Sequence, residues 1–309
     1  MTDKAHTTQL DDDLLRSWRL RLMANRRSRY TVRNYLQAGQ DLKAFMERQG
    51  CSMAVAAIKR STVEAYQVDC MDRGLGEATI CNRHKGLKQL FAFLVDDEEI
   101  DVSPMARMPV PAVTEPDVPV LSDADVAALL GVCSGSSFTQ RRNLALLTLM
   151  LDSGLRLQEV TDLSLESLAT MEDGVISVLG KGSKWRDVAI GHGTVAALDR
   201  YLRIRRRHRY ASSTDQLWLG QQGAITARSV GEIVAVTGRR AVLGAIHPHQ
   251  LRHTWASNMK EAGAQHDELK ALGGWSTDVM LQRYGRATLK RRAVASGRRL
   301  SVVDRLARK

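Results

Sequence analysis

The chain has 309 residues, of which 44% are hydrophobic and 26% are charged. This composition is typical of a globular protein and argues against a disordered chain, a collagen-like fibre or a membrane protein. The longest nearly apolar stretch, residues 144–151, is much shorter than the ~20 apolar residues that a membrane-spanning helix needs. The N-terminal region carries acidic residues and has no apolar secretion signal, so we expect a cytoplasmic protein.

The net charge of +11 indicates an anionic partner. Most of the excess lies in residues 111–309, which contain 22 Arg and only 6 Lys. Arginine is suited to bidentate contacts with phosphate. A basic chain of this kind commonly binds a polyanion, of which nucleic acid is the usual example.

In chain order, the first 103 residues are predicted to be helical. Apolar residues at helical spacing predict a helix that ends before Gly50. The segment 61–64, Ser-Thr-Val-Glu, is a capping box that predicts a helix ending near Gly74. A further amphipathic helix is expected over residues 77–95. Its polar side carries three basic residues, which could contact DNA or form a solvated face: Arg83, Lys85 and Lys88.

Five of the six prolines lie between positions 104 and 119. Proline removes backbone donors and disfavours helix, so residues 104–120 are predicted to form an extended linker. The chain is thereby divided into a helical domain over residues 1–103 and a second domain over residues 121–309.

The second domain is predicted to be mixed. A capping box at Ser122 should open a helix that runs to about Leu130, and Gly154 should end a buried helix that contains residues 144–151. Two strands joined by a Gly-rich turn should follow over residues 175–190. Pro248 is placed to begin a helix that runs to about Ala262. The remaining expected elements are helices over 193–208 and 226–240, and two short helices before a basic tail.

Several chemistries have no visible sequence motif. The chain has no Walker A loop, no GxGxxG at a strand–helix junction, no HExxH, no GxSxG and no carboxylate cluster with metal spacing. The four cysteines, at positions 51, 70, 81 and 133, form no CxxC pair. We therefore expect buried reduced cysteines rather than a disulfide framework or a zinc site, and no cofactor.

A set of basic and aromatic residues lies instead at turns and helix ends. Each has a structural explanation when it is taken alone. Arg156 could pair with Glu159, Lys181 could be a solvated turn residue, His249 could cap or pack, and Trp275 could belong to the core. A single tyrosine is more often structural than nucleophilic.

The order and spacing of these residues are more specific than any one of them. The segments that carry this pattern are Ser153–Val160, Gly180–Arg186, His249–Thr254, Leu272–Ser276 and Gln282–Gly285. Together they resemble the motifs of the tyrosine site-specific recombinases, which include the phage integrases and the Xer-type recombinases. The linker and the N-terminal helices also look like the core-binding domain of that family.

The resemblance implies a fold that is mainly α with a small β-sheet (α+β). A helical, SAM-like core-binding domain and a catalytic domain with a basic tail would form a C-shaped clamp on DNA. The hairpin residues Lys184 and Arg186 are further expected DNA contacts.

The resemblance also implies the chemistry. Tyr284 would be the nucleophile that forms a 3′-phosphotyrosyl link, and Arg156 and Arg252 would stabilise the charge on the phosphate, without metal or ATP. Lys181 would protonate the leaving 5′ oxygen and His249 would assist proton transfer. Many family members have histidine where this chain has Trp275. Because an indole cannot transfer a proton at pH 7, we expect that residue to contact the phosphate and to pack.

The expected partner is double-stranded DNA with short inverted-repeat core sites, without an added arm-site-binding domain. The protein would act as a homotetramer on paired sites, associated with the nucleoid, and would be a monomer or weak oligomer alone. The tail after Tyr284 would dock on a neighbouring protomer or lie along DNA as a basic arm. Two other functions stay open, a type IB topoisomerase activity and non-catalytic DNA binding with the same fold.

Overall fold

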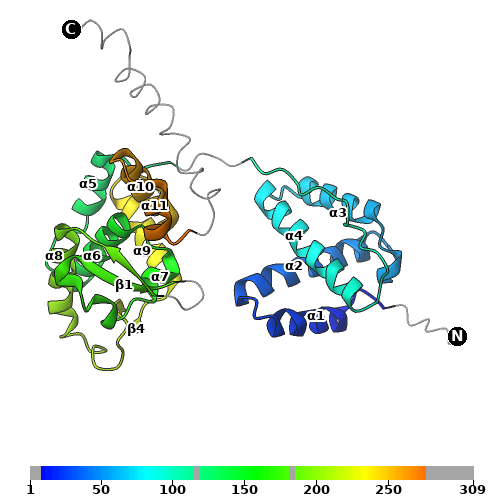
Figure 1. The fold of residues 1–309 in the computed structure, drawn as a ribbon, viewed down its shortest axis with the longest axis horizontal. Coiled ribbons are helices and arrows are strands. Elements are labelled where there is room, and N and C mark those ends of the chain that lie inside the picture. The colour runs from blue at the N-terminus through cyan, green and yellow to red at the C-terminus, as the bar shows by residue number, and fades with distance from the viewer. Residues whose placement is uncertain (1–7, 115–118, 181–184, 276–309) are drawn as a thin grey trace, which may run out of the picture. The chain divides into compact units, whose positions relative to one another are not determined.

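The structure is a computed structural model that describes residues 8–114, 119–180 and 185–275. The chain divides into two compact units, Met1–Pro116 and Asp117–Lys309 (Figure 1). Within the described ranges both units are mainly helical, and the strands form two small antiparallel sheets. The expected fold class, mainly α with a small β-sheet, is therefore confirmed. No helix in these ranges combines the length and the apolar character needed to cross a membrane.

The described part of the first unit is built mainly of helices, and polar side chains fix where the first two begin. The Asp11 carboxylate accepts a hydrogen bond from the Leu14 amide, and the Ser28 hydroxyl accepts one from the Thr31 amide. Such caps satisfy amide groups that have no partner within the helix. The helices of this unit are α1 (Asp12–Ala24), α2 (Arg29–Arg48), α3 (Arg60–Asp72), α4 (Glu77–Asp96) and the 3-10 turn η1 (Val55–Ala57).

In this unit one helix was missed and one expectation was wrong. The helix α1 was not predicted, and the capping box at Ser61 is wrong because α3 already begins at Arg60. The hydroxyl that binds the start of α3 is that of Thr62, which accepts a hydrogen bond from the Lys59 amide at 3.4 Å. The ends of α2 and α3 before Gly50 and Gly74 are as predicted.

The core of the first unit lies where α2 packs closely against α4. A Cβ atom at Gly86 would lie only 2.7 Å from the Cβ atom of Ala38, so this glycine allows the two helices to approach. The segment predicted as a linker contributes to the same core, because Met105 and Met108 are buried in it. The Thr114 amide, further along that segment, donates a hydrogen bond to a carboxylate oxygen on α4.

Several helices of the second unit begin or end where the sequence predicts. The Ser122 hydroxyl accepts a hydrogen bond from the Asp125 amide, and the left-handed residue Gly154 ends the long helix before the first arginine motif. Pro248 begins a helix as expected. The helices are α5 (Asp123–Gly131), α6 (Phe138–Ser153), α7 (Leu157–Thr161), α8 (His192–Arg205), α9 (Ala227–Arg240), α10 (Pro248–Glu261) and α11 (His266–Gly273), with the 3-10 turns η2 (Glu166–Leu168) and η3 (Met171–Asp173).

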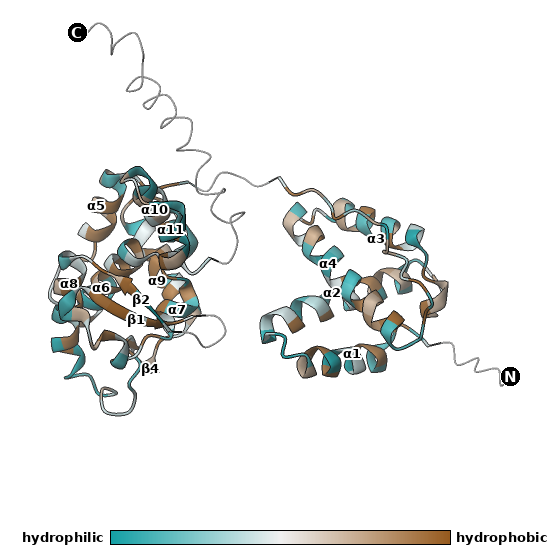
Figure 2. Cartoon of the chain, viewed as in Figure 1, coloured by the Kyte–Doolittle hydropathy of each residue, from teal (hydrophilic) through white to brown (hydrophobic). Residues whose placement is uncertain are grey.

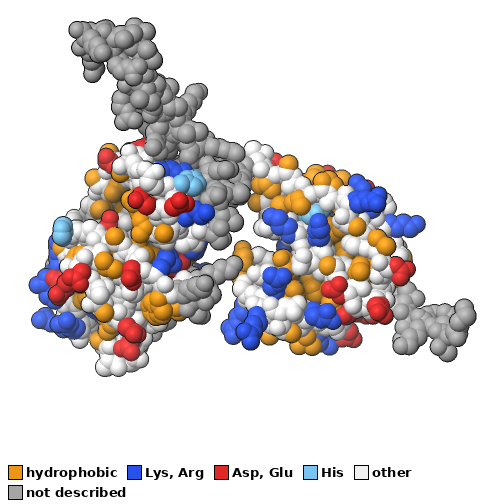
Figure 3. All heavy atoms as spheres, viewed as in Figure 1, with side chains coloured by type: hydrophobic (Ala, Val, Ile, Leu, Met, Phe, Trp, Pro, Cys, Tyr) orange, Lys and Arg blue, Asp and Glu red, His pale blue; other side chains and the backbone are white. Residues whose placement is uncertain are grey.

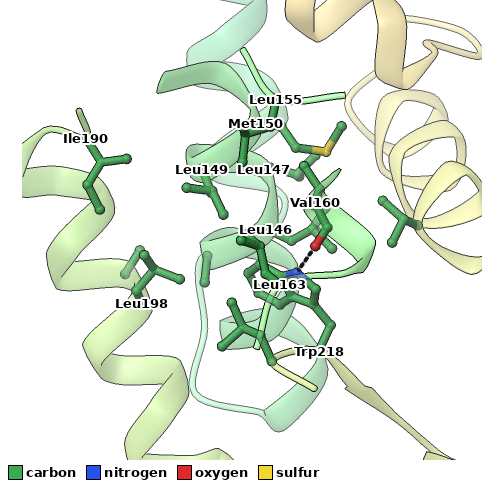
Figure 4. Packing of buried hydrophobic residues seen from close by; sticks show 14 of the residues in the cluster. Leu146, Leu147, Leu149, Met150, Leu155, Val160, Leu163, Ile190, Leu198 and Trp218 are labelled. Atoms are coloured by element: carbon green, nitrogen blue, oxygen red, sulfur yellow. Dashed lines mark hydrogen bonds between the residues drawn. The ribbon is translucent and has the colours of Figure 1, made fainter. Parts of the chain in front are cut away.

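The core of the second unit is centred on α6, which packs against α8 and α10. Leu146, Leu149 and Leu198 are fully buried in it (Figure 4). The buried indole of Trp218 donates a hydrogen bond of 2.8 Å to the carbonyl of Val160 on α7 (Figure 4). This core therefore holds the short helix α7, and with it the turn between α6 and α7.

The second unit also contains an antiparallel two-stranded hairpin, formed by β1 (Val175–Leu179) and β2 (Trp185–Ala189). A second hairpin consists of β3 (Leu219–Gly220) and β4 (Gly223–Ala224). The strand β1 is among the most hydrophobic segments of the unit (Figure 2). Because side chains alternate along a strand, Arg186 lies on the same face as the buried Val188, and Trp185 lies on the exposed face.

The cysteine prediction is correct for three residues and wrong for one. Cys70, Cys81 and Cys133 are buried, whereas Cys51 is exposed in the segment after α2. All four are free thiols in the structure.

Candidate active site

The first arginine lies in the turn that joins α6 to α7. Gly154 ends α6 in the left-handed conformation, with a φ angle of 59°. A Cβ atom there would lie 2.0 Å from the ring of Trp255, so both the backbone angle and the tight packing require glycine. The chain then passes through the buried Leu155, and Arg156 becomes the residue that precedes the first turn of α7. The side chain of Arg156 is 41% exposed, which leaves it accessible from outside.

A buried carboxylate holds this arginine and a second one. Glu159 is only 8% exposed. It accepts hydrogen bonds from the Arg156 amide at 2.8 Å and from the Arg156 guanidinium at 3.0 Å. The Arg186 guanidinium of β2 binds both oxygens of the same carboxylate, at 3.0 and 2.8 Å. The predicted pairing of Arg156 with Glu159 is thus confirmed, and it is part of a larger network.

The electrostatics of Glu159 agree with this geometry. Burial alone would raise the pKa of the Glu159 carboxyl, because a charge is poorly solvated there. The hydrogen bonds from Arg186 and the Arg156 amide, together with the two guanidinium charges, outweigh burial and hold that pKa below its usual value. Glu159 therefore remains ionised and keeps both arginines in place.

Arg252 lies on α10 and is almost completely buried, with 2% of its surface exposed. Its guanidinium donates to the carbonyl of Gly154 at 2.5 Å and to the carbonyl of Gly273 at 2.6 Å. The same guanidinium lies over the ring of Trp275, 4.3 Å from the ring centroid, which is cation–π geometry.

The two arginines meet at adjacent backbone carbonyls. Arg156 donates to the carbonyl of Gly274 at 2.6 Å, and Arg252 donates to the carbonyl of Gly273 at the same distance. Gly274 has a φ angle of 62°, and a Cβ atom on it would lie 3.1 Å from the Arg156 guanidinium. Two cationic groups that are far apart in the sequence are therefore fixed side by side at the end of α11. Such a pair can bind the oxygens of a phosphate group.

The histidine of the third motif lies one turn before Arg252. His249 is exposed in the first turn of α10, and its ring lies 4.5 Å from that of His253 in an edge-to-face arrangement. The predicted common face of His249 and Arg252 follows from their spacing on this helix.

Trp275 is buried, with 5% of its surface exposed, and its ring lies 5.9 Å from that of Trp255. The predicted contribution of Trp275 to the core is therefore confirmed. Its ring also packs against the guanidinium of Arg252.

Three expected site residues lie outside the described residues, namely Lys181, Lys184 and Tyr284. The hairpin that carries the two lysines is described on both sides of its turn, and its register pairs Leu179 with Trp185. Trp275 is the last described residue before the segment that contains Tyr284.

The predicted basic face of α4 is only partly exposed. Lys85 and Lys88 are exposed, on a unit whose visible face carries Lys and Arg side chains at many points (Figure 3). The side chain of Arg83 is 18% exposed and forms an ion pair of 2.6 Å with Asp41 of α2. Arg83 and Arg186 are thus both engaged with acidic residues inside the protein.

The sequence did not predict that Glu159 joins Arg156 to Arg186. It also did not predict that the carbonyls of Gly273 and Gly274 hold the arginine pair. A signal for Arg186 was present, because strand alternation places it on the face of Val188. Within the described ranges, no group of three or more His, Cys, Asp or Glu side chains is arranged to hold a metal ion.

Comparison with known proteins identifies related sequences. Residues 119–291 match the sequence pattern of the phage integrase family. The tyrosine recombinase XerD of Caulobacter vibrioides is 30% identical over 274 residues, which cover 86% of this chain and 89% of that protein. The tyrosine recombinase XerC of Actinobacillus pleuropneumoniae is 28% identical over 259 residues, which cover 83% of each chain.

Solved structures with the same fold include two recombination proteins in complex with DNA. One is the XerH site-specific recombinase bound to a palindromic difH substrate, with a TM-score of 0.74, 16% identity, and coverage of 94% of this chain and 90% of that one. The other is the Tn1549 transposon integrase in complex with transposon right end DNA, with a TM-score of 0.73, 20% identity, and coverage of 94% and 99%.

Proposed function

This chain belongs to the phage integrase family and is a tyrosine recombinase, an enzyme of site-specific DNA recombination, and from that premise we propose how its own residues act. The substrate is double-stranded DNA, which is cut and rejoined through a covalent link between Tyr284 and a 3′ phosphate. The catalytic set comprises Arg156, Lys181, His249, Arg252, Trp275 and Tyr284.

The observation that carries the proposal is the fixed arginine pair. Attack on a phosphodiester increases the negative charge on its non-bridging oxygens, and guanidiniums that are already oriented can stabilise that charge without reorganising. Arg156 and Arg252 are held by adjacent carbonyls, and Glu159 fixes Arg156 further. The arrangement is suited to one phosphate group that contacts both side chains.

The proposed reaction exchanges one phosphoester bond for another in each step. The Tyr284 hydroxyl oxygen attacks the phosphorus, the bond to the 5′ oxygen breaks, and a 3′-phosphotyrosyl bond forms. Lys181 gives a proton to the leaving 5′ oxygen, and His249 assists removal of the tyrosine proton. The 5′ hydroxyl of another strand then attacks the phosphotyrosyl bond and releases the tyrosine. Because the phosphotyrosyl bond retains the energy of the original linkage, no ATP is required.

Trp275 contributes to this scheme through its contacts and takes no part in proton transfer. Its indole N–H can donate a hydrogen bond to a phosphate but cannot serve as an acid or base near pH 7. Its ring lies against the Arg252 guanidinium, so it also restricts the orientation of that arginine.

The DNA contacts extend beyond the catalytic set. The exposed residues Lys85 and Lys88, together with Lys184 of the hairpin turn, are suited to bind backbone phosphates. Arg83 is paired with Asp41, and Arg186 is paired with Glu159. We therefore expect these two arginines to support DNA binding indirectly, by holding neighbouring side chains in position.

The domain roles follow from the same proposal. Residues 1–103 form the core-binding domain, residues 104–120 the linker, and residues 121–309 the catalytic domain with its basic tail. The palindromic substrate of XerH supports a target with inverted-repeat core sites. The active assembly is a homotetramer on two paired sites, and it works in the cytoplasm at the nucleoid.

Strand exchange between two differently labelled duplexes tests the function. The duplexes carry DNA from the flanks of the protein's own gene, and recombinant products are read on a gel. Products that join the two labels support recombination. Relaxation of supercoiled DNA without such products would indicate a type IB topoisomerase, and binding without either activity would indicate a non-catalytic protein.

A second experiment tests the role of Lys181. Lys181→Ala should slow cleavage much more than DNA binding. A substrate with a 5′-bridging phosphorothiolate has a leaving group that needs no proton, so it should restore much of the lost rate. If the rate stays low on that substrate, Lys181 is not the general acid.

A further inference from the structure

A pocket of about 670 Å³ lies between the start of α6, the β3–β4 hairpin and α9. This volume is in the range of small-molecule sites. The pocket shares no residue with the arginine pair, Glu159, Arg186 or Trp275. Its polar lining includes the cations Arg142 and Arg240, the amides Gln221 and Gln222, and the hydroxyls of Thr139, Thr226 and Ser229.

The most informative residue of the pocket is Arg142, which is 9% exposed. A buried guanidinium normally has a carboxylate partner, because an uncompensated charge is costly away from water. Among the residues that the structure describes, no carboxylate lies within 4 Å of Arg142. Its guanidinium donates to the carbonyl of Leu219 at 3.0 Å and, with two nitrogens, to one oxygen of Asn143 at 3.1 and 2.9 Å.

These contacts give Arg142 no ionic partner within hydrogen-bond distance among the described residues. Three of the five N–H groups of the guanidinium have acceptors, all of them neutral, and the other two have none within the described ranges. Burial accordingly lowers the pKa of Arg142 below its usual value. An anion in the pocket would supply a negative charge beside Arg142 and accept hydrogen bonds from its two remaining N–H groups.

Two helix ends add positive potential at the same place. Thr139 belongs to the first turn of α6, and Thr226 caps α9, whose first turn contains Ser229. The amide groups at a helix N-terminus favour anions, phosphate above all. One acidic residue, Glu232, also lines the pocket, against the two cations Arg142 and Arg240.

We propose that this pocket binds a small organic phosphate, with the phosphate near Arg142 and the helix starts and the organic part along Ile225, Ile233 and Val236. These three apolar side chains line the pocket beside the polar groups. The volume is larger than one phosphate ion needs, so the organic part contributes to the affinity. The pocket shares no residue with the described members of the proposed catalytic set, Arg156, His249, Arg252 and Trp275.

Isothermal titration calorimetry with adenosine 5′-monophosphate as the probe tests the proposal. The full chain is used without DNA, and inorganic phosphate is titrated at the same ionic strength. The titration is repeated with Arg156→Gln, which weakens phosphate binding at the arginine pair. Saturable binding that persists in Arg156→Gln supports the separate pocket. Binding that is lost in that variant, or the lack of saturable binding in any protein, would overturn the proposal.

Variants within the pocket complete the test without changing the buried Arg142. Ser229→Asp places a carboxylate in the pocket and should weaken binding of the probe by about tenfold or more, because like charges repel. Arg240→Gln should weaken it in the same direction. The matched control is Arg239→Gln, which removes the neighbouring exposed arginine that does not line the pocket and should leave the affinity unchanged. Unchanged binding in Ser229→Asp, or equal affinity for inorganic phosphate, would contradict the assignment.

Discussion

Glu159 and Arg186 form a buried bidentate ion pair that joins α7 to the second strand of the hairpin. The two contacts measure 3.0 and 2.8 Å, and the side chains are 8% and 17% exposed. Since Glu159 also binds Arg156, one carboxylate links the first arginine of the site to the strand that leads from the Lys181 turn. The stability of the fold and the geometry of the site therefore depend on the same group.

Replacing this carboxylate by an amide should destabilise the protein. Glu159→Gln leaves the partly buried Arg186 without a charge partner, and we expect the free energy of unfolding to fall by about 2–4 kcal/mol. Urea unfolding followed by circular dichroism at pH 7 measures this difference. As a control, Glu166→Gln removes a carboxylate for which the structure shows no hydrogen bond or ion pair, and it should have little effect.

The effect of Glu159→Gln should depend on pH. The pKa of Glu159 is lowered in the folded protein, so its stabilising contribution is complete above the unfolded value of about 4.3. The contribution is lost as pH falls through the lower, folded value. The difference between wild type and variant should therefore shrink as pH falls below about 4. A difference that stays constant would show that the carboxylate charge is not what stabilises the fold.

Gly154→Ala should be strongly destabilising. The left-handed backbone costs an alanine about 1–2 kcal/mol, and the contact of its Cβ atom with Trp255 should cost about 1–3 kcal/mol more. Gly193→Ala is the matched control, because a Cβ atom at this helical position in α8 meets no atom within 4 Å. That change should be neutral or slightly stabilising. Equal thermal unfolding midpoints for the two variants would contradict this account of the turn before Arg156.

His84 should make the stability of the protein sensitive to pH. The residue is 1% exposed, and its Nδ1 atom lies 2.8 Å from the Gln67 amide nitrogen. Burial, and then the charges of Lys88 and Lys85, lower the pKa of His84 in the folded protein. Below the unfolded value of about 6.5 the unfolded chain binds more protons, so stability should fall as pH decreases.

The variant His84→Gln isolates this contribution because glutamine does not titrate. Chemical unfolding at pH 7.5 and at pH 5.5 gives the loss of stability over this range for each protein. Wild type should lose more than His84→Gln. An equal loss in the two proteins would show that other groups cause the pH dependence.

Local patterns predicted the parts of the fold that depend on neighbouring residues. The amphipathic spacing over 77–95 predicted α4, the Ser122 capping box predicted the start of α5, and Pro248 marked the start of α10. Each of these signals acts within one or two turns of helix. The pattern that would have predicted α1, the Asp11 cap before Leu14, Leu15 and Trp18, was also local and was missed.

Contacts between distant segments could not be predicted in the same way. The spacing of Arg156 and Glu159 predicts their ion pair, but nothing in it predicts Arg186 as a third member. Likewise the helix that was expected over 193–208 ends at Arg205, whose side chain binds the carbonyls of Gln216 and Leu217. Those acceptors become neighbours only after the chain has folded.

The arginine pair should be required for chemistry more than for binding. Arg156→Lys keeps the charge but cannot reproduce the planar guanidinium that binds Glu159, Gly274 and a phosphate together. We expect cleavage to slow by about 10²–10³-fold with little change in DNA affinity. The control Arg206→Lys, at an exposed position after α8, should cleave normally. The rate of nicking of a labelled duplex, measured beside a gel-shift titration, separates the two effects.

Covalent trapping tests the central claim most directly. The protein is mixed with labelled DNA from the flanks of its own gene, the reaction is stopped with SDS, and a denaturing gel shows any protein–DNA adduct. Peptide mass spectrometry then identifies the modified residue. The account predicts an adduct at Tyr284 that Tyr284→Phe abolishes while DNA binding persists. An adduct at another residue, or cleavage that continues in Tyr284→Phe, would contradict it.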